Sequence, residues 1–327
     1  MKKRNLLSIV VPAYNEEGLL VKLMEELSVT LTDFKQYDYE VIFVNDGSTD
    51  GTWKEVCKLH EKTNMGGRIW GISFSRNFGK EAAIMAGLAY ANGGAVITMD
   101  SDLQHPPEVI PEFIQKWREG HKIVEGIKKN RGDESRLYRF FADRFYRIMS
   151  RAVGRDLRNT SDYKLLDREV VNILLKMPEK QIFYRAITSW VGFDTAYVEY
   201  DVKKRLSGKS KWSAAGLFLY AVRNITAFSS APLQIITVCS ICFFALGLYE
   251  GVLTLIRVVS GTAAEGFATV IILQLISGSI IMLGLGLIGF YLSKIYDEIR
   301  NRPQYIIEDK MEWKKQDNDE EPYEPYE

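Results

Sequence analysis

Two long apolar runs in the last third of the chain constrain its fold more than any other feature. Apart from a few small polar residues and Glu250, the run 233–256 is apolar, and a second run spans about 268–292. Each is long enough to cross a hydrocarbon core of roughly 30 Å as a helix. The connection 257–267 is short and consists mostly of small residues, so the sequence predicts a two-helix transmembrane hairpin. Two buried helices of a soluble protein are the alternative.

The charges around this hairpin predict its orientation. The loop carries Arg257 against Glu265, whereas both flanks are basic. The flanking basic residues are Lys203, Lys204, Arg205, Lys209, Lys211 and Arg223 before the hairpin, and Lys294, Arg300 and Arg302 after it. Because Lys and Arg accumulate in cytoplasmic loops, we expect both outer ends in the cytoplasm and a multi-pass protein of the cell membrane. Gly284, Gly286 and Gly289 indicate close helix packing in the second crossing.

The totals exclude several classes of protein. The formal net charge is zero, so the composition gives no indication of nucleic-acid binding. Three cysteines, Cys57, Cys239 and Cys242, are too few for a disulfide framework, and the last two lie inside an apolar run. The N-terminal apolar run 6–11 is too short for the core of a signal peptide, so the domain before the hairpin is expected to stay in the cytoplasm.

The chain up to about residue 130 alternates between short β-branched runs and stretches of helical periodicity. Strands are predicted at 7–11, 40–45, 68–74, 95–99 and 122–125, with helices between them at 16–31, 52–61, 79–91 and 107–119. Continuous apolar strands separated by helices are typical of an α/β fold with a parallel sheet covered on both faces. Ligands of such sheets bind outside the carboxyl ends of the strands, so polar residues there are the first candidates for chemistry.

Two candidate segments follow the first two predicted strands. VPAYNEE occupies residues 11–17, and VNDGSTDGT occupies residues 44–52. In the second segment Asp46 follows a buried strand, where a carboxylate can accept hydrogen bonds from a base or a ribose. Gly47 and Gly51 permit a tight turn. An ordinary strand–turn–helix junction is the alternative interpretation of this segment.

A third segment, MDSDLQHP at residues 99–106, follows the fourth predicted strand. Asp100 and Asp102 are two residues apart, and both carboxylates can turn toward one point where a strand ends. Gln104 can add an amide oxygen. Mg²⁺ commonly binds one or two carboxylates together with phosphate oxygens. The segment therefore predicts a site for Mg²⁺ or Mn²⁺.

Two basic segments precede the hairpin. Residues 136–158 interleave arginines with aromatic side chains, as in a helix that rests at a membrane surface with its arginines reaching phosphates. RLSGKSKW at residues 205–212 gathers basic side chains around Gly208 and can close over a pyrophosphate. An ordinary solvated helix face and a plain juxtamembrane segment are the respective alternatives.

Together these segments resemble glycosyltransferase family 2, whose catalytic domain has the GT-A fold. They are most similar to the branch that acts on polyprenyl phosphates, the bactoprenol glucosyltransferases and dolichyl-phosphate mannosyltransferases. The matching motifs, in family order, are VPAYNEE, VNDGSTDGT, SRNFGKEAA (75–83), MDSDLQHP, TSDYKLLDR (160–168) and RLSGKSKW. The resemblance covers nearly the whole chain except its acidic end.

The resemblance implies roles for individual residues. The nucleotide is expected at Pro12, Tyr14, Glu16, Asp46, Asp100, Arg205, Lys209 and Lys211. The metal is expected at Asp100, Asp102 and Gln104, and the lipid phosphate at Arg139, Arg147 and Ser161. Asp102 and Asp162 are expected to be catalytic, with Asp162 at the place of a proposed base. Some relatives carry glycine there (TSGF for TSDY). Since a phosphate acceptor is already mostly a dianion, a role for Asp162 in orienting groups remains the alternative.

The implied reaction is the inverting transfer of a hexose such as glucose from a UDP-linked donor to undecaprenyl phosphate. Motif positions do not distinguish glucose from N-acetylglucosamine or mannose. The implied partners are the membrane, further copies of the chain in a homo-oligomer such as a tetramer, and a flippase. A polysaccharide synthase is disfavoured because the chain lacks a Gln-x-x-Arg-Trp motif, and a dehydrogenase because no Gly-x-Gly-x-x-Gly follows the first predicted strand. A non-catalytic scaffold that binds lipid or a flippase is the alternative of another class.

The sequence thus predicts four parts. The catalytic domain spans 1–212, and a juxtamembrane amphipathic segment spans 213–230. The two crossings lie within 231–293, and a cytoplasmic tail spans 294–327. From about residue 309 this tail is acidic and is expected to be disordered.

Overall fold

The computed structural model describes residues 6–32, 36–61, 68–129, 160–179, 182–202, 231–260 and 267–311, with the isolated positions 144, 146, 147, 149–151, 154 and 156. The chain divides into two compact units. One comprises Met1–Ser213 together with Pro303–Glu327, and the other is Ala214–Arg302. Arg139, Arg205, Lys209 and Lys211 lie outside the described residues.

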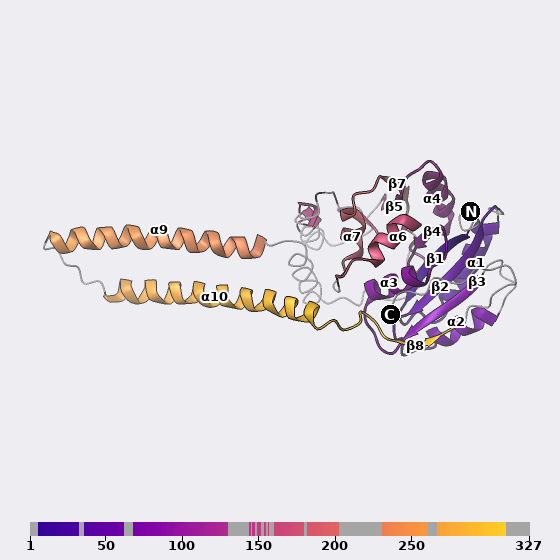
Figure 1. Ribbon diagram of the computed structural model, residues 1–327, viewed down its shortest axis with the longest axis horizontal. Helices are drawn as coiled ribbons and strands as arrows, with labels where there is room; N and C mark the ends of the chain where they lie inside the picture. The colour runs from indigo at the N-terminus through magenta and orange to yellow at the C-terminus, as the bar shows by residue number, and fades with distance from the viewer. Residues whose placement is uncertain are drawn as a thin grey trace. The chain divides into compact units, whose positions relative to one another are not determined.

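A mixed sheet of eight strands forms the first unit within the described residues (Figure 1). The strands are β1 (Leu6–Ala13), β2 (Asp38–Asn45), β3 (Arg68–Phe74), β4 (Ala95–Thr98), β5 (Ile123–Lys128), β6 (Lys164–Asp167), β7 (Thr195–Tyr200) and β8 (Ile307–Lys310). Their order across the sheet is β7-β5-β6-β4-β1-β2-β3-β8, and all neighbours are parallel except those of β6 and β8. The predicted α/β class with a mostly parallel sheet is confirmed.

Helices cover both faces of this sheet, because successive strand side chains point to opposite faces. Ile9 and Val11 of β1 belong to a core with α1 (Leu20–Thr32), α2 (Thr52–Glu61) and α4 (Ile110–Arg118). Val10 belongs to the opposite core, with α3 (Lys80–Tyr90), α6 (Arg168–Leu175) and α7 (Tyr184–Trp190). Apolar side chains on both faces of the central strands explain the continuous apolar runs of the sequence.

The first helix begins at Leu20, not at residue 16 as predicted. The backbone N–H groups before it are bonded to the segment after β2 instead. Asn15 N–H donates to Ser48 Oγ at 2.9 Å, and Glu16 N–H donates to Thr52 Oγ1 at 2.9 Å. These bonds join VPAYNEE and VNDGSTDGT into one structure at the carboxyl edge of the sheet.

Strand β6 runs against its neighbours, which the sequence did not indicate. It is antiparallel to both β4 and β5, and Lys164 at its start pairs with Thr98 at the end of β4. The beginning of β6 therefore lies at the edge where the parallel strands end. This reversal brings Asp162, two residues before β6, to the same edge as Asp100.

Strand β8 adds a segment from the end of the chain to the outer edge of β3. Ser75 N–H donates to Ile306 O at 3.1 Å, and the Tyr305 ring stacks on Phe74 with centroids 5.0 Å apart. Trp53 Nε1 donates to Asp309 Oδ2 at 3.0 Å. The sequence had indicated neither this strand nor any order around residue 309.

The second unit contains two long helices, α9 (Ala231–Val259) and α10 (Phe267–Ile299), which lie side by side in Figure 1. A Cβ built on Gly284 would lie 3.5 Å from Ile236 Cγ2, so this glycine is at the contact between the helices. Among the described residues one stretch, Ile276–Ile299, is long and apolar enough to cross a membrane. Helix α9 contributes a shorter apolar stretch, Val238–Leu253. The two helices are confirmed, whereas a hairpin that crosses a membrane twice stays a prediction.

Candidate active site

Four charged side chains meet at the carboxyl edge of the sheet, and we call them the ionic cluster: Lys80, Asp100, Asp162 and Arg185. Lys80 begins α3, and its Nζ lies 2.6 Å from Asp100 Oδ1 and 2.6 Å from Asp162 Oδ2. Arg185 of α7 donates from Nε to Asp162 Oδ1 at 2.8 Å and from Nη2 to Asp162 Oδ2 at 3.1 Å. Its Nη1 donates to the hydroxyl of Tyr146 at 2.8 Å. Asp162 is thus held by two cations from different helices.

Ion pairing outweighs burial in this cluster. Burial alone would raise the pKa of Asp162, but the charges of Arg185 and Lys80 hold it well below its ordinary value. Burial also acts to raise the pKa of Asp100, and Lys80 again reverses the direction, so the pKa is lowered. Both carboxylates are therefore ionised at neutral pH, and Asp162 in this arrangement is a weak proton acceptor.

The turn after β4 carries the predicted metal residues. Asp102 is 7% exposed, and its Oδ1 accepts the backbone N–H of Gln104 at 3.1 Å. His105 Nδ1 accepts the backbone N–H of Asp100 at 2.9 Å. Burial lowers the pKa of His105, so the ring is neutral and its proton is on Nε2. Leu103 has a φ of +61°, a backbone conformation that costs energy for such a residue and that the packed turn maintains.

The donor atoms at this turn suit a hard divalent cation. Asp100 and Asp102 supply carboxylate oxygens, and Gln104 follows them at the same turn. Within the described part of the chain, no group of three or more His, Cys, Asp and Glu side chains is placed to hold a metal on its own. Two carboxylates completed by ligand phosphates is a common arrangement for Mg²⁺. These residues therefore fit a cation that binds together with a phosphorylated ligand.

Asp46 organises the turn that starts α3. Its carboxylate accepts the backbone N–H of Phe78 at 2.7 Å, that of Gly79 at 3.0 Å and Asn77 Nδ2 at 2.9 Å. Burial raises the pKa of Asp46, while the two backbone hydrogen bonds act in the opposite direction. Because α3 begins directly after this turn, Asp46 helps to place Lys80 in the ionic cluster.

A buried ion pair supports the backbone on both sides of Asp162. Lys164 Nζ lies 3.0 Å from Glu125 Oε1, with side chains that are 0% and 3% exposed. Lys164 also donates to Thr188 Oγ1 at 2.9 Å, and Glu125 accepts the backbone N–H of Ser161 at 3.1 Å. Residues 161 and 164 are thereby fixed to β5 and α7, which fixes the position of Asp162 between them.

The other predicted residues occupy varied places. Pro12 is buried in β1, Tyr14 is 36% exposed after it, and Glu16 is half-buried. Arg147 is exposed. Ser161 is completely buried, and its hydroxyl donates to Gly126 O at 2.7 Å, which turns this side chain toward the protein interior.

Sequence reasoning assigned no role to Lys80, Arg185 or His105. The first lies in SRNFGKEAA and the last in MDSDLQHP, so their motifs were available as signals. Arg185 lies in a short helix outside every motif, and only the fold brings it to Asp162, 23 positions away in sequence.

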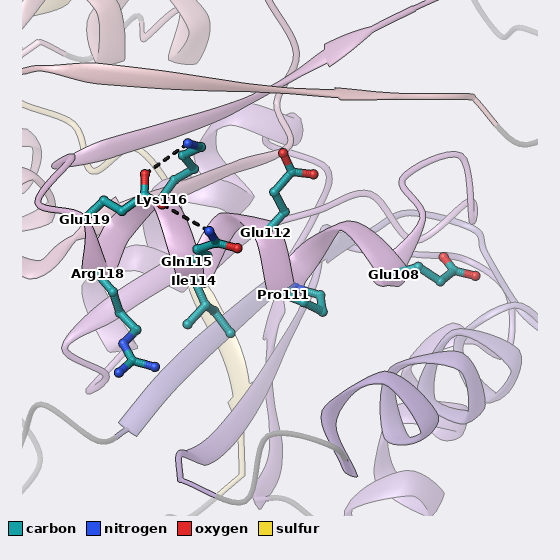
Figure 2. A pocket seen from close by; sticks show the side chains of 8 residues that line it. All are labelled: Glu108, Pro111, Glu112, Ile114, Gln115, Lys116, Arg118 and Glu119. Carbon is teal, nitrogen blue, oxygen red and sulfur yellow. Dashed lines mark hydrogen bonds and ion pairs between the residues drawn. The ribbon is translucent and has the colours of Figure 1, made fainter.

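A pocket of about 730 Å³ lies along α4 and the preceding turn (Figure 2). Its lining residues are Glu108, Pro111, Glu112, Ile114, Gln115, Lys116, Arg118 and Glu119. Lys116 and Gln115 both donate to Glu119, at 3.0 and 3.1 Å, and Figure 2 shows these contacts along one side of the helix. None of the candidate site residues lines this pocket, so it is separate from the ionic cluster.

Comparison with known proteins agrees with this geometry. The sequence profile of the family described as Glycosyl transferase family 2 matches residues 8–174, just over half of the chain. The chain belongs to this family. It is therefore a glycosyltransferase, and the match covers β1 to β6 together with Lys80, Asp100 and Asp162.

Curated relatives match most of this glycosyltransferase. An uncharacterized glycosyltransferase of Synechocystis sp. is 38% identical over 305 residues, which is 93% of the chain and 95% of the relative. The SfII prophage-derived bactoprenol glucosyl transferase of Shigella flexneri is 36% identical over 303 residues, 92% of the chain and 97% of the relative. A prophage bactoprenol glucosyl transferase homolog of Escherichia coli K12 is 36% identical over 310 residues, 92% of the chain and 98% of the relative. Alignments of this length extend well beyond the sheet into the region of α9 and α10.

Proposed function

We propose that this glycosyltransferase transfers a sugar from a nucleotide-sugar to a polyprenyl phosphate, undecaprenyl phosphate, at the cytoplasmic face of the cell membrane. The observation that carries this proposal is the extent of the likeness to bactoprenol glucosyl transferases. It spans 92% of the chain and 97% of the Shigella flexneri relative, so it includes the long helices as well as the sheet. A lipid acceptor also explains why the enzyme would have a membrane unit, because such a unit keeps the active site beside the bilayer in which the acceptor lies.

The path of the chain supports two membrane crossings. The second unit, Ala214–Arg302, is followed by β8, which is hydrogen-bonded to β3 in the first unit. A chain that leaves one folded unit and returns to it crosses a membrane an even number of times. Since α10 contains a stretch that is long and apolar enough to cross, we infer that α9 completes the hairpin. The basic flanks orient both outer ends toward the cytoplasm.

The proposed step is a single displacement at the anomeric carbon. An oxygen of the acceptor phosphate attacks the anomeric carbon. The bond between this carbon and the diphosphate oxygen of the donor breaks at the same time, and its electron pair leaves with the nucleoside diphosphate. An α-linked donor then gives a β-linked product. The acceptor is mostly a dianion at neutral pH, so no base is required. This agrees with the pairing of Asp162 to Arg185 and Lys80, which favours a role in orienting groups over one as a base. A divalent cation at Asp100 and Asp102 would stabilise the charge of the leaving group.

The identity of the sugar is the finer part of the proposal. Glucose from UDP-glucose is the first candidate because the named relatives are glucosyl transferases. N-acetylglucosamine and mannose are the alternatives. A non-catalytic scaffold is disfavoured. It would need neither the ionic cluster nor the carboxylate of Asp102 and the amide of Gln104 beside it. A homo-oligomer such as a tetramer, and a flippase partner, remain predictions from the resemblance.

A turnover assay tests the proposal. The full-length protein is incubated in lipid nanodiscs with undecaprenyl phosphate and, in separate reactions, UDP-glucose, UDP-N-acetylglucosamine, UDP-galactose and GDP-mannose. Mass spectrometry of the lipid should show one sugar added to the phosphate with one donor, and EDTA should stop the reaction. Lipid that stays unmodified with every donor and with added Mg²⁺ or Mn²⁺ would contradict the proposed activity and favour the scaffold.

A further inference from the structure

Two cationic side chains from different helices, Lys80 of α3 and Arg185 of α7, contact the carboxylate of Asp162. Lys80 reaches it from the start of α3, and the fork of Arg185 reaches it from α7. The side chain of Asp162 is 12% exposed, whereas that of Lys80 is 42% exposed and that of Arg185 is 25% exposed. The Asp162 side chain is therefore the most buried of the three, and those of Lys80 and Arg185 are more accessible to an anion.

The surroundings of the cluster add further positive charge. Lys128, at the end of β5, interacts electrostatically with Arg185 and Lys80 as well as with Asp100 and Asp162. Lys80, Lys128 and Arg185 together carry three positive charges at the edge of the sheet where Asp100, Asp102 and Asp162 carry three negative ones, so a divalent cation bound at Asp100 and Asp102 would leave this edge net positive. Such a concentration of cations at the carboxyl edge attracts phosphates, and the planar guanidinium of arginine matches phosphate and carboxylate equally well.

We propose that Lys80 and Arg185 bind the phosphate monoester of the acceptor, and that Asp162 is a positioning residue that holds both cations in place. The inference rests on the proposed function, since it names the residues that receive the acceptor at the same site. The Arg185 fork can share its donors between Asp162 and a phosphate oxygen, as arginine commonly does in anion sites. Lys80 contributes a point charge that can move between partners without a fixed geometry.

Lys80 also links this phosphate site to the turn after β4. Its ammonium group is shared between Asp162 and Asp100, at 2.6 Å from each. If Asp100 held a divalent cation, Lys80 would lose one of its two carboxylate partners, and its charge would become available to the acceptor phosphate. The two substrates are then coupled, and the acceptor phosphate binds more tightly once Mg²⁺ and the nucleotide are in place.

The test compares kinetic constants of variants in lipid nanodiscs. Lys80→Gln and Arg185→Gln remove one charge each, and Arg185→Lys keeps the charge but removes the fork. Lys22→Gln on α1 and Arg118→Gln on α4 are matched controls, because both side chains are exposed and lie outside the cluster. The cluster variants should raise the KM for undecaprenyl phosphate roughly 10- to 100-fold. This is the change in affinity expected when one hydrogen bond to a charged group is lost. The KM for the nucleotide-sugar should stay within about threefold, and the controls should resemble wild type.

A second probe does not depend on turnover. Binding of inorganic phosphate to the full-length protein is followed by ³¹P NMR, with and without UDP and Mg²⁺. Wild type should bind phosphate more tightly when UDP and Mg²⁺ are present, and Lys80→Gln should lose that difference. Calorimetric binding of UDP in the presence of Mg²⁺ confirms that each variant is folded. Inorganic phosphate should also compete with undecaprenyl phosphate in wild-type turnover, which separates recognition of the phosphate from recognition of the lipid chain.

The outcomes separate the two proposals. If wild type modifies no lipid with any donor, the proposed function fails. If wild type is active but the cluster variants keep the acceptor KM within about twofold, or raise the nucleotide-sugar KM instead, the cations serve another ligand and this inference fails. Phosphate binding that is unchanged in Lys80→Gln and Arg185→Gln contradicts it independently of activity.

Discussion

Asp102 is almost buried at the turn after β4, and its carboxylate already accepts the N–H of Gln104. Asn at this position keeps an oxygen for that hydrogen bond but loses the charge that a hard cation requires. We expect Asp102→Asn to lower kcat by roughly 100-fold or more with either Mg²⁺ or Mn²⁺. Its thermal unfolding midpoint should stay close to that of wild type. Asp38→Asn, at the exposed start of β2, is the matched control. Near-normal turnover of Asp102→Asn would remove this residue from the site.

The buried pair of Glu125 and Lys164 makes a second prediction at this scale. Lys164→Met leaves the Glu125 carboxylate without its counter-ion in the interior, which costs about 3–5 kcal/mol of unfolding free energy. The double variant Glu125→Leu/Lys164→Met should recover part of that loss, because no unpaired charge remains. Denaturant unfolding in detergent measures both. Lys116→Met breaks the exposed pair with Glu119 and should leave the unfolding midpoint almost unchanged. Equal stability of Lys164→Met and wild type would show that the pair is not structural.

Single residues also show where sequence reasoning stops. Asp100, Asp102 and Asp46 were found because each lies within three residues of the end of an apolar run, and the structure places all three at one edge of the sheet. The partners of Asp162 were not found. Lys80 is 82 positions from it, and Arg185 has no motif around it. No local pattern encodes a contact that exists only because α3 and α7 begin at the same edge of the sheet.

At the scale of elements, the strands up to residue 128 were predictable because they are short continuous apolar runs, and the helices between them because they carry an apolar period. Between residues 160 and 200 no element was predicted, and of the elements beyond residue 128 the strands β6 and β8 give the least local signal. Strand β6 has only four residues, and its sequence, KLLD, gives no sign that it runs antiparallel between β4 and β5. Strand β8, IEDK, is largely polar and exposed, since it only covers an edge. Strand β8 is positioned by its pairing with β3, because the outer backbone N–H and C=O groups of β3 would otherwise lack hydrogen-bond partners.

The role of β8 leads to a prediction about truncation. A chain that stops after residue 302 loses β8 and the Tyr305 contact with Phe74, and it exposes the outer edge of β3. We expect a lower unfolding midpoint and concentration-dependent aggregation of the detergent-solubilised protein. A chain that stops after residue 312 keeps β8 and loses only the acidic end, so it is the matched control. Light scattering and thermal unfolding distinguish the two. Identical behaviour of both truncated chains and wild type would show that β8 adds nothing to stability.

The whole molecule is constrained by the order of its units along the chain. The sheet begins before α9 and is completed after α10, so the helices are an insertion between β7 and β8. A single crossing would place β8 and β3 on opposite sides of a membrane, which their hydrogen bonds forbid. Composition alone identifies one candidate span, in α10. The pairing of β8 is therefore independent support for the second crossing, and it agrees with the orientation that the basic flanks predict.

Cysteine labelling tests that topology in cells. The native residues Cys57, Cys239 and Cys242 are first replaced by Ser, and single cysteines are then introduced as Asn5→Cys, Thr262→Cys or Asn318→Cys. A maleimide that cannot cross the membrane, added outside, should label Thr262→Cys and leave the two end positions unlabelled until the cells are permeabilised. Labelling of one end only would mean a single crossing and would contradict the β3–β8 pairing. Protection of all three sites would mean that neither helix crosses, and the apolar side chains exposed on α9 and α10, such as Phe244 and Leu283, would then need a protein partner in place of lipid.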